Sequence, residues 1–309
     1  MEKTFLITVD TEGDNQWNIY HGENIHTENA KYIPTFQKIC DEFRFKPVYL
    51  VNYEMICNDY LVDFFREQLM MGKCEVGMHL HAWNSPPLYL LNEKYNGNPY
   101  ITEYPKDIIF QKMEYLTKLI ESRVGVRPVS HRAGRWATNN IIFNVLAELG
   151  YEVDCSIVAG CDMSKYPGRS TNVGFNYKNV ADKPYMINAS ILEVPMVVKK
   201  YRTIAGKNIK SKMKNILFGK DLWFRPALST VKEMKKHVDE KTHQESNYLE
   251  FMIHSSELMP GGSPYFKTKR EIEQEYKDIR AIFEYVYKKG FIGKTLKEYK
   301  EIALTSSSN

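Results

Sequence analysis

Two short pairs of polar residues have the types and the spacing of a metal site. Asp10 and Glu12 are separated by one residue, and so are His79 and His81. Side chains two residues apart on a strand point to the same side, so each pair can present both members to one site. One carboxylate and two imidazoles form a ligand set for a catalytic divalent metal that keeps an open position. The second carboxylate is then available as a general base.

Arg132 and His254 are the further ionisable residues that fit this chemistry. An arginine beside a carboxylate can hold it by two hydrogen bonds and keep it ionised. A histidine can protonate a leaving group, because its unperturbed pKa is near neutrality. Arg132 lies in the segment SHRAGRW, where Gly134 suggests either a close backbone approach or a turn, and where Trp136 could stack on a sugar or pack in the core.

The elements that must position these residues are short apolar runs, which we predict to be strands. They cover 4–10, 46–52, 74–81, 128–132, 151–157, 191–198 and 248–254. Helical patterns are expected between them, at 33–43, 59–71, 106–122, 141–149 and 269–289. This alternation predicts an α/β fold with a mostly parallel sheet. Ionisable residues end several of the strands, and the carboxyl ends of parallel strands meet at one edge, where active sites lie.

The composition is that of an ordinary globular protein. The chain has 309 residues, of which 43% are hydrophobic and 26% are charged, so disordered and low-complexity classes are excluded. The net charge of +4 is too small to indicate a nucleic-acid binder. The five cysteines never show C-x-x-C spacing, which favours buried thiols in a reducing cytoplasm. The first apolar run is too short for a signal peptide, and no run suggests a membrane-spanning helix.

Positive charge is concentrated in one segment. Residues 199–225 contain nine lysines and arginines against one acid, so this segment carries +8 and the rest of the chain carries −4. Within it, the stretch IKSKMKNILFGKDLWF at 209–224 mixes lysine with large apolar residues and is expected to be helical. A solvated loop is the plainer interpretation. The alternative is contact with an anion, such as a lipid phosphate, a nucleotide-sugar diphosphate or the inner face of a membrane.

Five sequence blocks occur in an order that resembles one enzyme family. The blocks TVDTEGD, EVGMHLHAW, SHRAGRW, GYEVDCS and FMIHSSEL resemble the NodB-type polysaccharide deacetylases (carbohydrate esterase family 4 and relatives), and most closely the WbmS-like branch tied to surface-polysaccharide gene clusters. The resemblance spans residues 8–266. It implies a single domain over 1–309, folded as a distorted (β/α)7 barrel with long loop insertions, among them the basic insertion 199–225. It also implies metal-dependent removal of an acetyl or other acyl group from a sugar of a surface-polysaccharide precursor.

The resemblance also assigns roles to residues. Asp10 is the expected catalytic base, Arg132 the residue that holds it, and His254 the general acid. Glu12 and His79 are expected metal ligands. The family's histidine pair is four residues apart, whereas the position four after His79 is Trp83, so the sequence leaves open whether His81 or another residue is the second imidazole ligand.

The remaining expectations concern the metal and the substrate. Zn²⁺ is the first choice of metal, with Co²⁺, Ni²⁺ or Mn²⁺ as alternatives. The expected substrate is a carbohydrate or a nucleotide- or lipid-linked sugar, not a nucleic acid. The residues expected to contact it are Trp83, Arg135, Trp136 and Glu257. Two other functions stay open: another C–N hydrolase on the same scaffold, such as a cyclic-amide hydrolase, and a non-catalytic glycan-binding protein with a decayed site.

Overall fold

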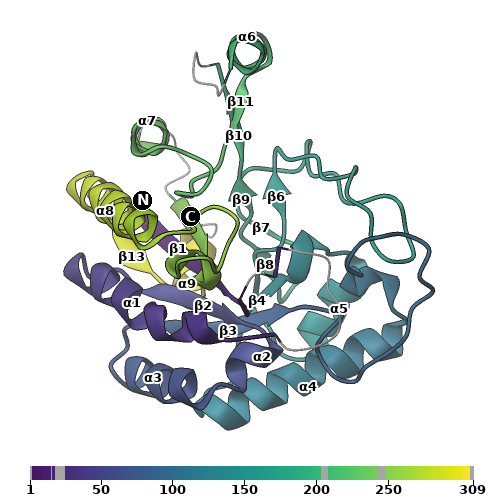
Figure 1. The fold of residues 1–309 in the computed structure, drawn as a ribbon. Helices are drawn as coiled ribbons and strands as arrows, with labels where there is room; N and C mark the ends of the chain where they lie inside the picture. The colour runs from purple at the N-terminus through teal and green to yellow at the C-terminus, as the bar shows by residue number, and fades with distance from the viewer. Residues whose placement is uncertain (1, 15, 18–24, 203–207, 243–247, 307–309) are drawn as a thin grey trace.

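A curled sheet of mostly parallel strands forms the centre of the molecule (Figure 1). The computed structural model describes residues 2–14, 16–17, 25–202, 208–242 and 248–306. Seven parallel strands follow one another across the sheet in the order β12 (Tyr248–His254), β1 (Thr4–Thr11), β2 (Pro47–Val51), β3 (Glu75–Leu80), β4 (Ser130–Ala133), β5 (Val153–Asp154) and β8 (Leu192–Glu193). The α/β prediction and the mostly parallel sheet are therefore confirmed.

Two further strands extend this sheet. The short β7 (Tyr185–Met186) pairs antiparallel with β8, and β13 (Ile292–Lys294) pairs parallel with the start of β1. The two ends of the curl meet through a side chain, because the Tyr248 hydroxyl of β12 donates to the Pro195 carbonyl just after β8 at 2.7 Å.

Strand register brings the polar strand ends to one edge. Asp10 of β1 lies opposite His254 of β12. Two strands away, His79 of β3 lies opposite Arg132 of β4. Parallel pairing thus places the carboxyl ends of these four strands together, as the sequence pattern predicted.

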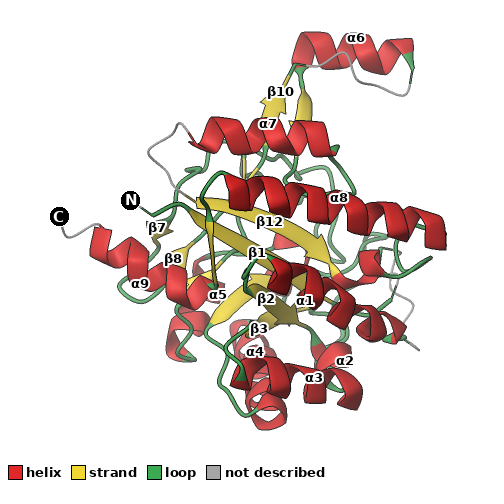
Figure 2. Ribbon diagram, turned by 90° about the vertical axis from the view of Figure 1, so that its left-hand side faces the viewer, coloured by secondary structure: helices red, strands yellow, loops and turns green. Residues whose placement is uncertain are grey.

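Helices surround the outside of the curl (Figures 1 and 2). In chain order they are α1 (Ile33–Glu42), α2 (Tyr53–Ile56), α3 (Asp59–Met70), α4 (Lys106–Val124), α5 (Asn140–Glu148), α7 (Val231–Thr242) and α8 (Lys269–Lys288). The last helix, α9 (Leu296–Ser306), packs instead against the apolar cluster that contains Leu6. Single 3₁₀ turns lie at Glu28–Tyr32, Ile101–Glu103, Gly134–Trp136 and Ser255–Leu258. No helix within the described ranges is both long and apolar enough to cross a membrane.

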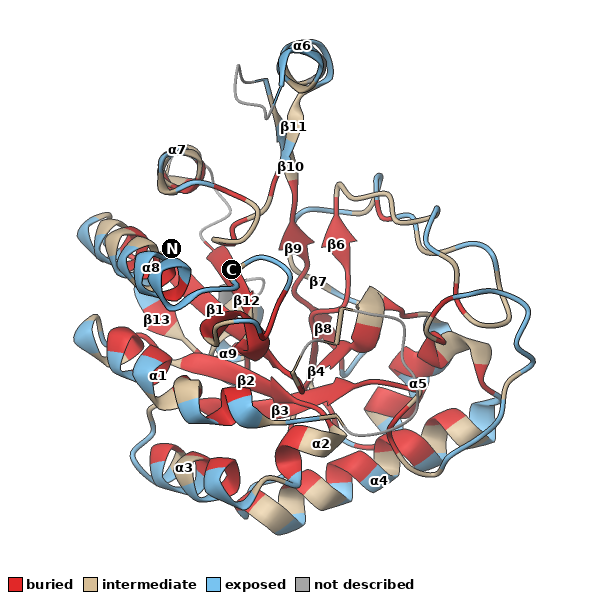
Figure 3. Ribbon diagram, viewed as in Figure 1, coloured by how far each residue is buried: buried red, intermediate tan, exposed pale blue. Residues whose placement is uncertain are grey.

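The seven parallel strands from β12 to β8 are buried on both faces, which is why most of them read as continuous apolar runs. Successive residues of β1 illustrate this: Phe5 and Ile7 belong to the core between the sheet and the helices, whereas Leu6 belongs to a second core inside the curl. Figure 3 shows the same pattern, with buried strands and helices that are buried only on their inner sides. Phe283 of α8 lies at the centre of the outer core, with its ring centroid 5.5 Å from that of Phe5 and 5.0 Å from that of Phe251.

Two predicted strands are shorter than expected. The run 191–198 divides into β8 and β9 (Met196–Val197), because Pro195 between them has no N–H to donate to a ladder. The run 151–157 contains only the short strand β5, because the Asp154 side chain accepts the Ser156 N–H at 3.1 Å and draws the backbone out of the sheet. A separate strand, β6 (Val158–Ala159), begins directly after the predicted run. Strands β6 and β9 then pair with each other in a separate small sheet.

The basic segment forms an arm that projects from the body (Figures 1 and 2). Antiparallel strands β10 (Lys199–Tyr201) and β11 (Lys220–Leu222) form its stalk, and α6 (Ile209–Phe218) lies at its tip. The helix predicted over 209–224 is too long, because Gly219 adopts a φ of 77° and ends it. Residues 203–207 of the basic segment lie outside the described residues.

Replacing Phe283 by alanine is expected to lower the free energy of unfolding by about 3–5 kcal/mol, because the lost ring leaves a cavity among its aromatic neighbours. Urea denaturation followed by circular dichroism measures this change. The matched control is Phe218→Ala on α6, whose ring is 70% exposed, where the change is expected to stay within about 0.5 kcal/mol. Equal losses in the two variants would contradict the core assignment.

Candidate active site

A pocket of about 250 Å³ lies at the carboxyl ends of the strands. Its wall contains five of the ionisable residues that the sequence singled out: Asp10, Glu12, His79, His81 and His254. The structure therefore brings together the D-x-E pair, the H-x-H pair and the histidine of the distant strand β12.

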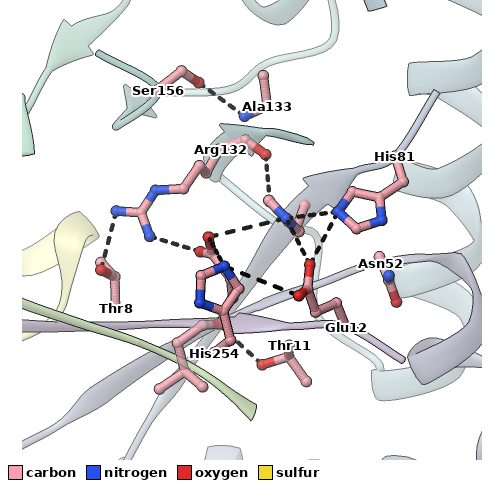
Figure 4. A network of polar contacts seen from close by, with 12 residues as sticks. Thr8, Thr11, Glu12, Asn52, His81, Arg132, Ala133, Ser156 and His254 are labelled. Carbon is pink, nitrogen blue, oxygen red and sulfur yellow. Dashed lines mark hydrogen bonds and ion pairs between the residues drawn. The ribbon is translucent and has the colours of Figure 1, made fainter. Parts of the chain in front are cut away.

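Glu12, His79 and His81 form a buried cluster whose ligand atoms all lie within 4.8 Å of one another. The Nε2 atoms of His79 and His81 are 3.0 Å apart, and Glu12 Oε2 lies 3.7 Å from the first and 3.1 Å from the second. Figure 4 shows Glu12 and His81 pointing toward one another across this cluster. Among the described residues, this is the one group of three or more potential metal ligands. Its two imidazoles are those of His79 and His81.

The geometry of this cluster fits a divalent cation. Ligand atoms bound to one tetrahedral ion at about 2.1 Å lie about 3.4 Å from each other, close to the separations above. The Nδ1 atom of His79 donates to the Arg132 carbonyl at 2.9 Å, which leaves the lone pair of Nε2 directed at Glu12 and His81. Burial disfavours the charged form of Glu12, but His254, His79 and His81 outweigh it and lower its pKa, so Glu12 is ionised at neutral pH.

His81 depends on a close backbone approach. A Cβ atom at Gly134 would lie 2.6 Å from His81 Cδ2 and 2.7 Å from the Leu80 carbonyl oxygen, so only glycine fits at this position. The close-approach interpretation of Gly134 is therefore confirmed.

Arg132 is fully buried and holds Asp10. Its Nη1 donates to Asp10 Oδ1 at 2.6 Å, its Nη2 donates to Thr8 Oγ1 at 3.0 Å and also to Glu250, and its Nε donates to the Cys155 carbonyl at 3.0 Å. Figure 4 shows this guanidinium between Thr8 and the pocket. Burial disfavours the charged form of Asp10, but Arg132 and the nearby histidines outweigh it and lower its pKa. Asp10 is therefore ionised at neutral pH, and its other oxygen, Oδ2, is directed toward His79 and His254.

His254 lies across the pocket from His79. Its Nε2 is 3.8 Å from Asp10 Oδ2. Its Nδ1 is 2.8 Å from Arg225 Nη2 and 3.2 Å from Glu257 Oε1, so both a donor and an acceptor hold this side of the ring. Glu257 is fully buried behind His254, away from the pocket wall where a substrate contact was expected. Burial disfavours its charged form, but Arg225 and His254 outweigh it and lower the pKa of Glu257.

All four tryptophans of the chain gather at this pocket. Trp17, Trp83 and Trp136 line it, and Trp223 packs against Trp136 with ring centroids 6.3 Å apart. The Trp83 ring stacks on His81 at 4.4 Å and 23°. Flat indole faces of this kind suit the apolar face of a sugar ring.

Arg135 lines the pocket, but its guanidinium is committed to the surrounding loops. It donates to the backbone carbonyls of Asn98 and Pro167 and to the Tyr100 hydroxyl. Arg135 and Trp136 also adopt φ angles of 57° and 60°, which is uncommon for residues other than glycine. Two successive left-handed residues turn the chain sharply at the pocket rim, a type of strain that clusters at functional sites.

The ionisable residues that end β4 and β5, His131 and Asp154, lie outside the pocket wall and stabilise the strand end that carries Arg132. His131 Nδ1 lies 2.6 Å from Asp154 Oδ1, and both residues are buried. Asp154 also accepts from the Ser156 hydroxyl at 2.9 Å, which in turn accepts the Ala133 N–H at 2.8 Å, a contact shown in Figure 4. These bonds secure the end of β4 beside Arg132.

Three contributors to the site were missed by sequence reasoning: Trp17, Arg225 and Glu250. Trp17 comes from a segment outside the strands that carry the motifs. Arg225 ends the basic segment 199–225, which was interpreted as a solvated loop or an anion contact and not as part of the pocket. Glu250 had a signal, because it lies four residues before His254 on the same strand, and residues at even spacing share a face.

Comparison with known proteins shows a likeness in structure alone. No family model and no curated protein matches the chain. A protein from Mycobacterium smegmatis assigned as a polysaccharide deacetylase superposes with a TM-score of 0.54 at 13% identity, over 99% of this chain and 92% of that chain. The 4-alpha-glucanotransferase of Thermococcus litoralis superposes with a TM-score of 0.54 at 15% identity, over 97% of this chain and 40% of that chain.

The fold is the NodB-type barrel. The predicted distorted (β/α)7 barrel is thereby confirmed, with its seven parallel strands in a curl that the Tyr248–Pro195 contact bridges. At these identities the likeness extends to the fold, and the roles of the residues rest on the geometry described above.

Replacing Arg132 by glutamine is expected to cost about 3–5 kcal/mol of stability, because two buried carboxylates lose their partner. The double variant Arg132→Gln/Glu250→Gln is expected to regain part of this loss, since one of those carboxylates becomes a neutral amide. The control is Arg280→Gln, whose exposed pair with Glu42 is expected to contribute at most about 1 kcal/mol. Chemical denaturation measures all three, and a loss no greater than that of the control would contradict the buried network.

Replacing His81 by alanine is expected to weaken binding of Zn²⁺ or Co²⁺ by roughly 100-fold or more, since even the partners of metal ligands contribute roughly 10–100-fold. Isothermal titration of the metal-stripped protein measures the affinity, and the Co²⁺ absorption spectrum reports the coordination. His26→Ala, at an exposed histidine, is the control. Unchanged Co²⁺ binding and spectrum in His81→Ala would remove this residue from the ligand set.

Proposed function

We propose that the protein is a metal-dependent hydrolase that removes an acyl group, in the first instance acetyl, from the amine of a sugar. The observation that carries this proposal is the position of Asp10 Oδ2. This carboxylate oxygen lies 4.0 Å from His79 Nε2, beside the cluster of potential ligands, and 3.8 Å from His254 Nε2. A base, an acid and a three-ligand cluster therefore surround one small space, which is what hydrolysis of an amide requires.

Glu12, His79 and His81 would hold the cation, with Zn²⁺ as the first choice. When bound there, it would polarise the acyl carbonyl and lower the pKa of a water molecule. Asp10 would take the proton from that water through Oδ2, because Arg132 occupies Oδ1 and keeps the carboxylate ionised. His254 would give a proton from Nε2 to the departing amine nitrogen, while Arg225 and Glu257 hold the opposite side of its ring.

The substrate class is supported by the pocket wall and by the sequence blocks. The indoles of Trp17, Trp83 and Trp136 offer flat apolar surfaces for a pyranose ring. The sequence resemblance to the WbmS-like branch supports a sugar of a surface-polysaccharide precursor, made in the cytoplasm, as the substrate. Arg135 and Glu257 would act as positioning residues, since their charged groups are bound to the protein itself.

Activity on acetylated sugars tests the proposal. The metal-loaded protein is expected to release acetate from an N-acetylated sugar, and Asp10→Asn and His254→Gln are each expected to lower kcat by about 10²–10⁴-fold, the usual contribution of a general base or acid. His26→Gln is the matched control and is expected to keep full activity.

The same assay separates the other candidate functions. Release of product from cyclic amides, and not from acetylated sugars, would reassign the protein to another C–N hydrolase class. Sugar binding without turnover of either substrate in the metal-loaded protein would make it a glycan-binding protein. Full acetate release by Asp10→Asn or His254→Gln would refute the role given to that residue.

A further inference from the structure

The helix at the tip of the arm exposes large apolar side chains. Ile209, Met213, Ile216 and Leu217 of α6 are between 45% and 77% exposed, and none of the described side chains of this helix is buried. Figures 1 and 2 show α6 standing away from the body, and Figure 3 shows no buried residue in this helix. An isolated helix that packs on nothing gains no stability from such residues, so they require another explanation.

These side chains form a stripe with lysines on both sides. Residues at i, i+4, i+7 and i+8 of a helix lie on one face, and Ile209, Met213, Ile216 and Leu217 have this spacing. At about 100° per residue, Lys210 and Lys212 fall on opposite flanks of the stripe. An apolar stripe bordered by cations is typical of helices that lie in the plane of a membrane interface.

The protein neutralises only part of the charge of the arm, because Lys220 pairs with Glu233 and Arg225 pairs with Glu257 in the body. Residues 199–225 carry +8 on a chain whose remainder carries −4. The one acid, Asp221, already pairs with Lys200 at 2.7 Å. Lys210 and Lys212 are exposed and have no ion pair within the described part of the chain. The tip therefore presents free positive charge beside the apolar stripe.

We infer that α6 and its flanking lysines dock the protein on an anionic lipid bilayer. The ten-residue helix lies flat in the interface, with the stripe of Ile209, Met213, Ile216 and Leu217 entering the boundary between headgroups and acyl chains. Lys210 and Lys212 then lie at the level of the lipid phosphates, where each positive charge strengthens binding.

Charge complementarity favours a lipid surface over a second copy of the chain. A symmetric dimer through this stripe would place the same patch of each copy against the other, and so bring the unpaired Lys210 and Lys212 of two arms together. Anionic lipids meet both the apolar and the cationic parts of the surface, whereas such a dimer would satisfy only the apolar part.

The base of the arm adjoins the pocket. Strand β11 continues through Trp223 to Arg225, which lines the pocket and contacts His254. A docked arm would therefore connect the membrane surface with the pocket wall. If the proposed function holds, on which this extension rests, an acylated sugar on a lipid phosphate is the substrate form that such a position suits.

Vesicle binding by the full-length protein tests the docking surface without reference to catalysis. The protein is expected to cosediment with vesicles of phosphatidylcholine mixed with phosphatidylglycerol, less with phosphatidylcholine alone, and less as salt is raised. Lys210→Gln and Lys212→Gln are each expected to weaken binding roughly fivefold. The double variant Ile216→Ser/Leu217→Ser is expected to weaken it roughly tenfold or more.

The controls are Leu90→Ser and Lys277→Gln, at an exposed leucine of a body loop and an exposed lysine of α8, which are expected to bind as the unmodified protein does. Circular dichroism shows that each variant is folded. No binding to anionic vesicles, or binding that the arm variants leave unchanged, would overturn the inference. A dimer in light scattering that Ile216→Ser/Leu217→Ser dissociates would also overturn it, because the stripe would then be an interface between copies.

Discussion

The positive charge of a buried guanidinium has to be balanced by acceptors from the surrounding chain. The candidate active site is arranged around one such group. Arg132 is fully buried, and its donors meet Asp10, Thr8 and Glu250 together with a backbone carbonyl. The three side-chain partners belong to β1 and β12, so the network forms only when these two strands are neighbours in the observed register. Burying charges costs several kcal/mol per ion, and a well-packed apolar cluster would serve stability as well. The network is better explained by what it does to Asp10.

The two carboxylates that Arg132 contacts have opposite pKa shifts. Arg132 and the histidines outweigh burial and lower the pKa of Asp10, whereas burial outweighs Arg132 and raises the pKa of Glu250. Negative charge is therefore favoured on the carboxylate that faces the pocket. Environments that separate the pKa values of neighbouring acids are characteristic of acid–base sites. Both groups lie on strands, and such rigid positions suit chemistry that depends on distances of a few tenths of an ångström.

The order of elements could be predicted because buried parallel strands are continuous apolar runs, and because polar residues interrupt them where they reach the pocket. The meeting of Asp10, Glu12, His79, His81 and His254 followed from this pattern. Helix α7 was missed, because VKEMKKHVDEKT has few apolar residues and buries Met234 and Val238 through its position against α8. The contact of Arg225 with His254 was missed for a related reason. It depends on where the arm rejoins the body, and no local pattern encodes that.

The arm leaves and rejoins the body at adjacent points, since Lys199 of β10 pairs directly with Leu222 of β11. Because the two strands of the stalk pair with each other, the tip of the arm can lengthen, shorten or change composition while both strands keep their positions. The register of the central sheet, and with it the chemistry at the strand ends, is insulated from such changes. In evolutionary terms, the composition of the tip can change under selection while the barrel stays under separate constraint.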